Sequence, residues 1–293
     1  MTVVIKVGGA RAVDPAGALA DVASLVEDGE QVVVVHGGST KVDETLERLG
    51  IEPEYVETPS GVVGRFTDET TMEVFEMAFG HLNTQLVAGL QSLDVDAVGL
   101  NGVDGKLLHG PRKSAVRVVE DGKKKIRRGE HSGRIESVNA DLLTGLLDDG
   151  YTPVVSPPME GIEGDGGVTP VNADADRAAA AVAGALGADL VLLTDVAGVY
   201  ADPDDPDTLI DSAATPEELS AVEAAAEGFM GKKVMAAKEA LSGGSGRVVV
   251  ADANVRDPIV AALGGEGTTI QRSALGDDAD GDDAEAEAGG ETA

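Results

Sequence analysis

The chain opens with the stretch Val3-Val4-Ile5-Lys6-Val7-Gly8-Gly9, and a second stretch of similar design follows at Val33-Val34-Val35-His36-Gly37-Gly38. Each is a short run of mainly β-branched residues that ends in a glycine pair. Such runs are typical of buried strands, and we expect strands at residues 2–7 and 31–35. Helix-like segments follow them at about residues 15–28 and 39–49. A strand, a glycine turn and a helix in succession predict parallel strands joined by crossover helices.

The same alternation continues along the rest of the chain. Further strands are expected at residues 95–100, 152–155, 189–194 and 247–251. Further helices are expected at residues 67–90, 139–148, 175–187, 215–226 and 232–242. The pattern predicts an α/β fold in which helices cover both faces of a mostly parallel sheet.

The composition fits one large folded unit. The chain has 293 residues, 42% of them hydrophobic, which can fill a sizeable core shared by two lobes. It has no apolar run long enough to span a membrane. It has no cysteine, which excludes disulfides and cysteine-bound zinc. The chain enters its first strand without an apolar signal region, and we expect a cytoplasmic location.

The net charge is strongly negative, at −31 from 53 acidic and 22 basic residues. Such a field repels nucleic acid and anionic lipid, which argues against both as partners. The acidic residues are dispersed through the helices, and aromatic residues make up only 2% of the chain. This pattern predicts a halophilic protein from a high-salt cytoplasm, where salt screens the self-repulsion. An ordinary acidic protein is the alternative.

Two segments depart from this background. Residues 276–293 hold eight acids and no base, and they predict a disordered acidic tail. Residues 112–134 hold nine of the 22 basic residues against three acids, a local net charge of +6. Valines around Asp121-Gly122 predict a β-hairpin that turns there. We expect this basic hairpin to dock an acidic protein, although a solvated surface would show the same composition.

The two glycine pairs are candidate phosphate-binding turns. Glycine lets a backbone N–H approach a phosphate closely, at Gly8 and Gly9 after the first strand and at Gly37 and Gly38 after the second. Lys6 adds a positive charge beside them. The carboxyl ends of parallel strands share one edge of a sheet, where ligands bind. A turn with a solvated lysine is the alternative, and neither a Walker motif nor a dinucleotide fingerprint is present.

Four later segments carry polar residues in similar settings. Arg65 follows a glycine-containing stretch and could grip a carboxylate, or form a surface ion pair. The segment from Val171 to Arg177 places Asn172 and Asp176 at a helix start, where helix capping is the alternative. Residues 193–200 read as a strand entering a polar loop. Residues 228–234 read as a glycine loop that delivers Lys232 and Lys233 to a helix, or as charge on its first turn.

Taken in order, these six segments resemble the amino acid kinase family, and most of all N-acetylglutamate kinases, over roughly residues 1–270. The resemblance implies a three-layer αβα sandwich, with a lobe at residues 1–170 for the amino acid and a lobe at residues 171–270 for ATP. It also implies a homodimer or a larger assembly.

One segment points to a branch of that family. Pro59-Ser60-Gly61 and Arg65-Phe66-Thr67-Asp68 resemble enzymes whose substrate is attached to an amino-group carrier protein of the LysW type. The resemblance implies phosphorylation of the side-chain carboxylate of carrier-linked α-aminoadipate or glutamate, in lysine or arginine biosynthesis. The partner would be an acidic carrier protein.

The resemblance also assigns roles to particular residues. Lys6 and Lys233 would stabilise charge on the transferring phosphoryl group, Asp176 would orient these lysines, Gly8, Gly9, Gly37 and Gly38 would donate backbone N–H groups, and Arg65 and Asn172 would hold the substrate. Mg²⁺ would be carried on the ATP phosphates, with no metal site made by the protein. A carboxylate substrate is already ionised near neutral pH, so no general base is required.

Three alternatives remain open. The chain could phosphorylate free N-acetyl-L-glutamate, and a requirement for a carrier protein would separate the two substrates. It could be a catalytically silent regulator of the same fold, which an ATP-turnover assay would reveal. The basic hairpin could bind nucleic acid, but it lacks an aromatic residue for base stacking.

Overall fold

The computed structural model describes residues 1–8, 15–59, 61, 63–120 and 122–276. Its strands are β1 (Thr2–Val7), β2 (Gln31–His36), β3 (Tyr55–Glu57), β4 (Val63–Arg65), β5 (Ala97–Gly102), β6 (Leu108–Glu120), β7 (Lys123–Gly133), β8 (Ser137–Val138), β9 (Thr152–Ile162), β10 (Val168–Val171), β11 (Asp189–Thr194), β12 (Ser212–Ala213), β13 (Arg247–Asp252) and β14 (Thr268–Gln271). Its helices are α1 (Pro15–Glu27), α2 (Ser39–Arg48), α3 (Glu69–Gln91), α4 (Ala140–Asp148), α5 (Ala175–Leu186), α6 (Pro216–Ala225), α7 (Gly228–Ser242) and α8 (Pro258–Leu263).

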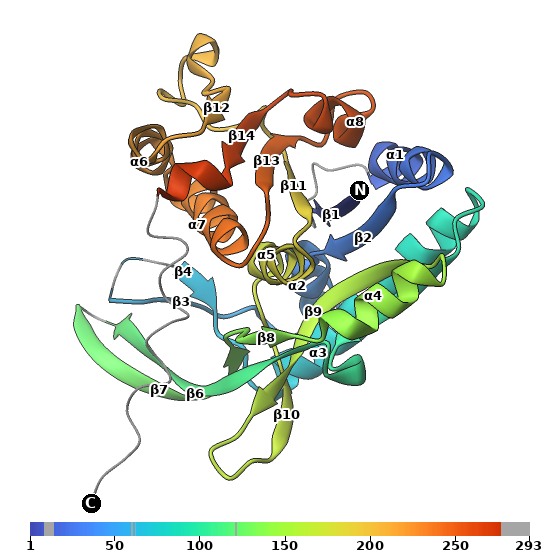
Figure 1. The fold of residues 1–293 in the computed structure, drawn as a ribbon. Helices are drawn as coiled ribbons and strands as arrows, with labels where there is room; N and C mark the ends of the chain where they lie inside the picture. The colour runs from blue at the N-terminus through green and yellow to red at the C-terminus, as the bar shows by residue number, and fades with distance from the viewer. Residues whose placement is uncertain (9–14, 60, 62, 121, 277–293) are drawn as a thin grey trace, which may run out of the picture.

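One large sheet runs through the molecule, in the order β12-β14-β13-β11-β1-β2-β9-β6-β7 (Figure 1). The central strands β13, β11, β1, β2 and β9 are parallel neighbours. Antiparallel pairs occur toward the two ends, between β13 and β14 and between β6 and β7. The mostly parallel central sheet predicted from the sequence is confirmed.

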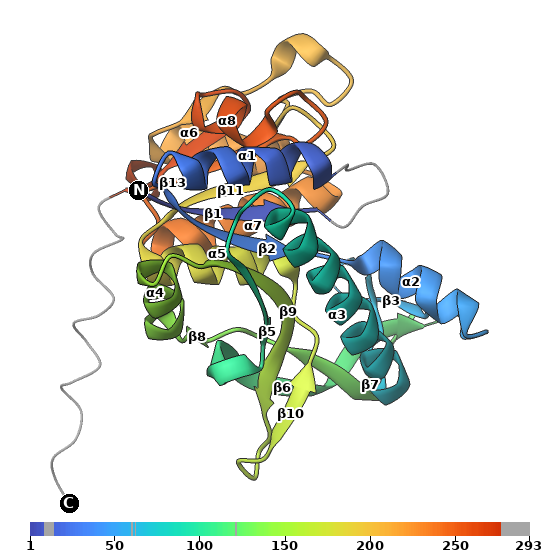
Figure 2. The ribbon, with the colours of Figure 1, turned by 90° about the vertical axis from the view of Figure 1, so that its right-hand side faces the viewer.

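The three layers follow from side-chain alternation along the central strands. Val4 of β1 packs into a core formed with α4, α5, α6 and α7. Its neighbours Val3 and Ile5 pack into a second core formed with α1, α3 and α8. Successive strand residues point to opposite faces, so a run of β-branched residues can fill both cores. Figure 2 shows the result, with α1 and α8 above the sheet and α5 and α7 below it.

Small residues bring α5 and α7 close together. Ala178, Ala179 and Ala180 of α5 are fully buried in the core that this helix shares with α7. Farther along α5, a Cβ on Gly184 would lie 3.0 Å from Gly243 Cα, just after α7. A larger side chain there would push the helices apart. This close packing matters because α5 and α7 each carry a predicted site residue.

The structure corrects several expected boundaries. Residues 228–231 do not form a loop, because α7 already begins at Gly228, whose φ of +56° allows a sharp turn from α6. β9 continues to Ile162, well beyond the expected residue 155. The hairpin of β6 and β7 is confirmed, with Val118 paired to Lys125. Asp121 and the segment 277–293, which covers nearly all of the expected acidic tail, lie outside the described residues. Among those that are described, no helix is long and apolar enough to cross a membrane.

Candidate functional site

The site lies where three parallel strands end. Lys6 of β1 stands in register with Val35 of β2 and Leu192 of β11, so the segments that follow these strands share one edge of the sheet. A cavity of about 470 Å³ opens there. It is lined by Lys6, Gly8, Gly37, Gly38, Ser39, Thr40, Asp174, Ala175, Asp176, Leu193, Thr194, Asp195, Phe229, Lys232 and Lys233.

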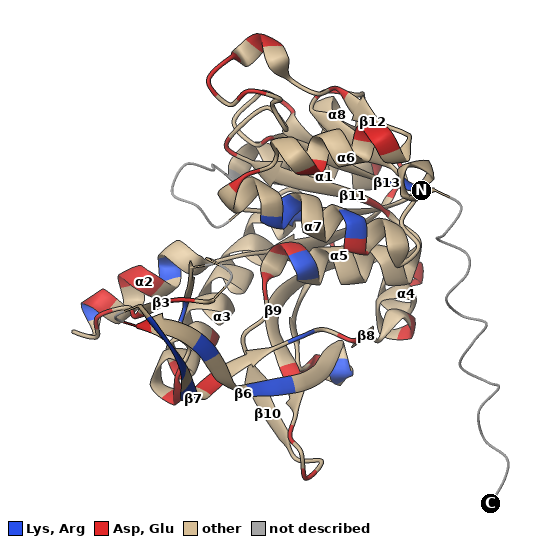
Figure 3. Cartoon of the chain, turned by 90° about the vertical axis from the view of Figure 1, so that its left-hand side faces the viewer, with Lys and Arg blue, Asp and Glu red and all other residues tan. Residues whose placement is uncertain are grey.

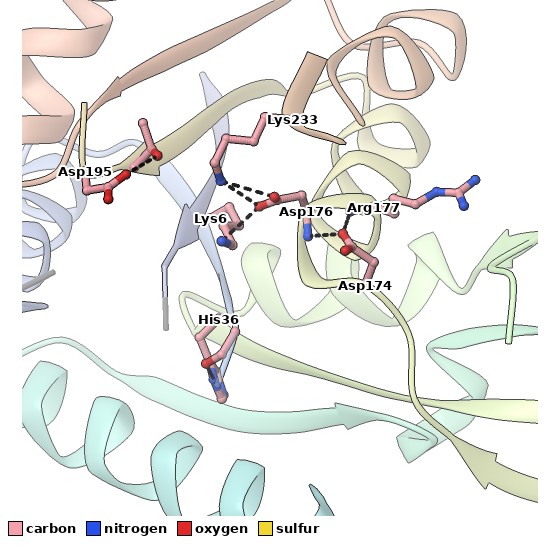
Figure 4. A network of polar contacts seen from close by, with 9 residues as sticks. Lys6, His36, Asp174, Asp176, Arg177, Asp195 and Lys233 are labelled. Carbon is pink, nitrogen blue, oxygen red and sulfur yellow. Dashed lines mark hydrogen bonds and ion pairs between the residues drawn. The ribbon is translucent and has the colours of Figure 1, made fainter. Parts of the chain in front are cut away.

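Two lysines and one aspartate meet at the inner end of this cavity (Figure 4). Lys6 Nζ lies 2.9 Å from Asp176 Oδ1, and Lys233 Nζ lies 3.1 Å from Asp176 Oδ2. The three side chains are only 9%, 12% and 13% exposed for Lys6, Lys233 and Asp176. They come from β1, α7 and α5, which are distant in sequence. The cluster carries one positive charge beyond neutrality, so it can attract an anion.

Burial and the neighbouring charges set the titration of this cluster. Burial raises the pKa of Asp176, but the charges of Lys6 and Lys233 outweigh it, and the pKa lies below the ordinary value. Burial lowers the pKa of Lys233, and repulsion from Lys6 lowers it further, while attraction to Asp176 opposes both. The carboxylate therefore stays ionised at neutral pH. Its negative charge partly offsets the lowering of the pKa of Lys233 by burial and by Lys6.

Asp176 is fixed by the start of α5. Asp174 precedes the helix and accepts hydrogen bonds from the backbone N–H groups of Asp176 and Arg177. Arg177 then forms a bidentate ion pair with Glu239 of α7. The helix cap is thus Asp174, and the carboxylate of Asp176 pairs with the two lysines instead.

The second glycine turn shapes the opposite wall of the cavity. A Cβ on Gly38 would lie 2.7 Å from Leu82 of α3, so glycine lets this turn pack closely against that helix. α2 starts directly afterwards, at Ser39, without a side-chain cap on its first N–H groups. Helix N-termini of this kind favour anions. Gly8 lies in the cavity lining, and Gly9 lies outside the described residues.

Comparisons with known proteins agree with this geometry. A family model described as the amino acid kinase family matches residues 1–252. The chain belongs to the amino acid kinase family. It is 45% identical to a LysW-aminoadipate kinase from Deinococcus radiodurans, covering 92% of this chain and 91% of that protein. It is 40% identical to an acetylglutamate kinase from Methanopyrus kandleri, covering 92% and 99%.

Solved structures support the fold. The chain is similar to N-acetylglutamate synthase from Neisseria gonorrhoeae complexed with coenzyme A and N-acetyl-glutamate, with a TM-score of 0.70 and 26% identity. The similarity covers 92% of this chain and 59% of that one. The three-layer arrangement expected from the family resemblance is confirmed.

Arg65 and Asn172 are the predicted site residues that do not line the cavity. Arg65 pairs with Asp43 and donates to Ser39 O at 3.1 Å, and its guanidinium lies over the rings of Tyr55 and Phe75. Asn172 joins the base of the hairpin through its backbone, which exchanges hydrogen bonds with His131 and Gly133. Both residues border the cavity through neighbouring segments, and the roles implied for them stay predictions.

His36 lies next to the second glycine turn. Its side chain is buried, with Nδ1 3.1 Å from Gly37 O and Nε2 3.3 Å from Asn83 Nδ2. Burial lowers its pKa to about 4, so the ring is neutral near pH 7. A buried neutral histidine with both nitrogens engaged is a packing and hydrogen-bonding residue.

Several lining residues had no predicted role. Thr194 and Asp195 follow β11, and the sequence indicated only a polar loop there. Phe229 and Lys232 face the cavity from the first turns of α7. Their position depends on where α7 begins, which the sequence did not place correctly. Among the described residues, no group of three or more histidine, aspartate or glutamate side chains could hold a metal ion.

Lysine and arginine residues gather along β6 and β7 (Figure 3), and the strand register sorts their side chains onto two faces of the hairpin. On one face Arg127 pairs with Glu54 and stacks on Phe66, with 4.1 Å between the guanidinium and the ring centroid. On the other face Arg117 pairs across the strands with Ile126, which is 67% exposed. This solvent face is made of Arg117, Val119, Lys124, Ile126 and Arg128. Its three basic side chains form no ion pair with a described residue.

Proposed function

We propose that this chain transfers the γ-phosphoryl group of ATP to the side-chain carboxylate of carrier-linked α-aminoadipate or glutamate, giving an acyl phosphate. The observation that carries this proposal is the buried cluster of Lys6, Asp176 and Lys233 at the carboxyl ends of the central strands. The LysW-aminoadipate kinase of D. radiodurans, similar over nearly its whole length, supports the substrate class.

The reaction needs positioning and charge stabilisation rather than a general base. The substrate carboxylate has an intrinsic pKa near ~4.3, so it is an anion at neutral pH. Its oxygen forms a bond to the γ-phosphorus while the bond to the bridging oxygen breaks, and ADP leaves with the electron pair. Lys6 and Lys233 neutralise charge on the transferring group, and Asp176 holds both lysines in place. Mg²⁺ bound to the ATP phosphates would neutralise further charge.

The amino-acid substrate would occupy the side of the cavity near α2. Gly37 and Gly38 offer backbone donors there, and Arg65 touches the carbonyl of Ser39. Arg65 Nε is buried and has no hydrogen-bond partner among the described residues. An unsatisfied buried donor is costly, and a substrate carboxylate would satisfy it if the Arg65 side chain turned toward the cavity, which it does not line in this structure. Residues 1–170 would then form the amino-acid lobe, with Asn172 at its boundary, and residues 171–270 the ATP lobe.

The solvent face of the hairpin would dock the carrier protein. Arg117, Lys124 and Arg128 present positive charge around the exposed Ile126, and none of the three pairs with an acid in the described part of the chain. On a chain of net charge −31, such a face is the region best suited to an acidic partner. Ile126 would supply an apolar contact at its centre.

The chemistry of the product tests this proposal. The enzyme is incubated with Mg-ATP, hydroxylamine and either carrier-linked glutamate, carrier-linked α-aminoadipate or free N-acetyl-L-glutamate. Hydroxylamine traps an acyl phosphate as a hydroxamate, which mass spectrometry detects. We expect a hydroxamate on both carrier-linked substrates, since one methylene changes binding by only about 1–3 kcal/mol. ADP release without any hydroxamate contradicts a carboxyl acceptor, and no ATP turnover favours a silent regulator.

Free N-acetyl-L-glutamate is the second candidate substrate. The acetylglutamate kinase of M. kandleri, 40% identical over nearly its whole length, favours it. Efficient phosphorylation of the free amino acid without a carrier would select this alternative while leaving the reaction and the site unchanged.

The setting of the enzyme is also a proposal. Lack of cysteine and the biosynthetic relatives support a cytoplasmic enzyme, and the family supports a homodimer or larger assembly. The excess of acidic residues supports a halophilic protein whose folding requires molar salt. Circular dichroism between low and high KCl tests the salt requirement for folding. Sedimentation over the same range tests the assembly. An unchanged melting temperature in ~0.1 M salt, where screening reaches about 10 Å, contradicts the salt requirement.

A further inference from the structure

Phe229 differs from the other aromatic side chains of the molecule. The chain has only four phenylalanines and three tyrosines, and no tryptophan. Phe66, Phe75 and Phe79 are buried, whereas Phe229 is 83% exposed. No other large apolar side chain in the described part of the chain is as exposed. The packing of the core therefore does not explain this residue.

The position of Phe229 points to a ligand of the cavity. It lies on the first turn of α7 and lines the same cavity as Lys6 and Lys233. The two lysines are nearly buried, so they mark the inner end of the cavity, and the exposed ring marks its outer end. Lys232 Nζ lies 5.5 Å from the ring centroid, which adds a cation beside the aromatic face.

This arrangement matches a nucleotide, with the base at the exposed ring and the phosphates at the nearly buried lysines. The inference rests on the proposed function. We propose that the ring of Phe229 is a stacking platform for the nucleobase of ATP. The triphosphate would extend inward toward Lys6 and Lys233, with Lys232 along its path. A flat base and an aromatic ring stack well whatever the base, because every base offers a π face. The platform therefore contributes affinity for nucleoside triphosphates more than selection among bases.

A single tryptophan makes the stacking directly visible. Phe229→Trp places the only tryptophan of the chain on this platform, since the natural sequence has none. We expect ATP and ADP to quench or shift its emission, and inorganic triphosphate to leave it nearly unchanged. Met235→Trp is the matched control, because Met235 is also exposed on α7 but lines the groove beside α6. We expect no nucleotide response from that variant.

Steady-state kinetics provide the second readout. Phe229→Leu removes the π system and keeps an apolar side chain, and we expect the KM for ATP to rise by about tenfold. The KM for the acyl-acceptor substrate should stay nearly constant, and Phe229→Tyr should restore the KM for ATP. Wild-type turnover combined with an unchanged KM for ATP in Phe229→Leu, or a silent Phe229→Trp at saturating ATP, overturns the platform alone. Wild-type enzyme without ATP turnover would instead overturn the proposed function.

Discussion

Two regions of this acidic chain gather positive charge, and they do so in opposite environments. At the cavity, Lys6 and Lys233 are nearly buried and share the carboxylate of Asp176. On the solvent face of the hairpin, Arg117, Lys124 and Arg128 are exposed and unpaired among the described residues. The first region is shielded from salt and fixed in geometry, and the second is open to both solvent and salt.

The difference in burial suits the two regions to different roles. Charges in a water-poor site interact strongly with a developing negative charge, so the cavity is suited to the chemical step. Exposed charges interact weakly one by one and are screened over about a Debye length. Their main effect is on the encounter and orientation of a large partner. Substitutions in one region at a time can therefore separate the chemical step from the recognition of the partner.

Removing a lysine from the cavity should have the largest effect. Lys233→Met deletes a nearly buried charge to which we assign stabilisation of the transferring phosphoryl group, and we expect kcat to fall by about 10³-fold. Lys6→Met should behave similarly. Lys238→Met is the matched control. Lys238 also lies on α7, but its side chain is at the surface, where it pairs with Glu223 of α6. A cavity variant that keeps near wild-type kcat at saturating Mg-ATP, with normal circular dichroism, would show that the site is wrongly placed.

Neutralising Asp176 should change both the rate and its pH dependence. Attraction to Asp176 raises the pKa of Lys233 against the lowering effects of burial and Lys6. In Asp176→Asn that attraction is lost, so Lys233 deprotonates at a lower pH than in the wild type. We expect kcat to fall by about 10²-fold and the alkaline limb of the kcat–pH profile to move to lower pH. An alkaline limb that stays in place would mean that Lys233 does not control it.

Salt should affect the hairpin more than the cavity. With carrier-linked substrate, we expect the KM to rise with KCl concentration, while the KM for ATP changes less. Replacing Arg117, Lys124 and Arg128 by glutamine should raise the KM for the carrier by about tenfold and flatten its salt dependence. Lys125→Gln is the control, since Lys125 pairs with Glu120 on the opposite face of the hairpin. Equal salt slopes in the two variants would contradict docking on the solvent face.

The ion pair between Arg177 and Glu239 should have the smallest effect. It joins α5 to α7 next to Asp176, but both side chains are more than a third exposed. Exposed pairs contribute about 0–1 kcal/mol. We therefore expect Arg177→Gln to lower kcat by only about two- to threefold and to shift thermal unfolding by a few degrees at most. A loss as large as that of Lys233→Met would assign Arg177 a direct catalytic role.

The sequence predicted the central strands well, because each is a buried run of β-branched residues. β1 and β11 match their expected ranges, and β2 ends one residue later than expected. Short and exposed strands were missed, such as β3, where Tyr55 is 53% exposed and no periodic pattern appears. The start of α7 was misplaced because Gly228 resembles a loop residue, although it is the residue that allows the turn from α6 into that helix.

The candidate site was only partly predictable from the residues themselves. The strand-end glycines and Lys6 could be identified from the pattern of strand followed by turn. The meeting of Lys6, Asp176 and Lys233 could not be derived from spacing, because it depends on how closely α5 and α7 pack. The family resemblance supplied those residues. The sorting of the hairpin charges into a paired face and a free face depends on strand register, which composition does not reveal.

We propose that the hairpin selects the carrier while the cavity performs the transfer. The most direct test is the ratio of kcat/KM for carrier-linked glutamate to that for free N-acetyl-L-glutamate. It is measured in the wild type and in the variant with Arg117, Lys124 and Arg128 replaced by glutamine. We predict that the ratio falls about tenfold in the variant, through the carrier-linked substrate alone. An unchanged ratio, or an equal loss on both substrates, would contradict selection of the carrier by the hairpin.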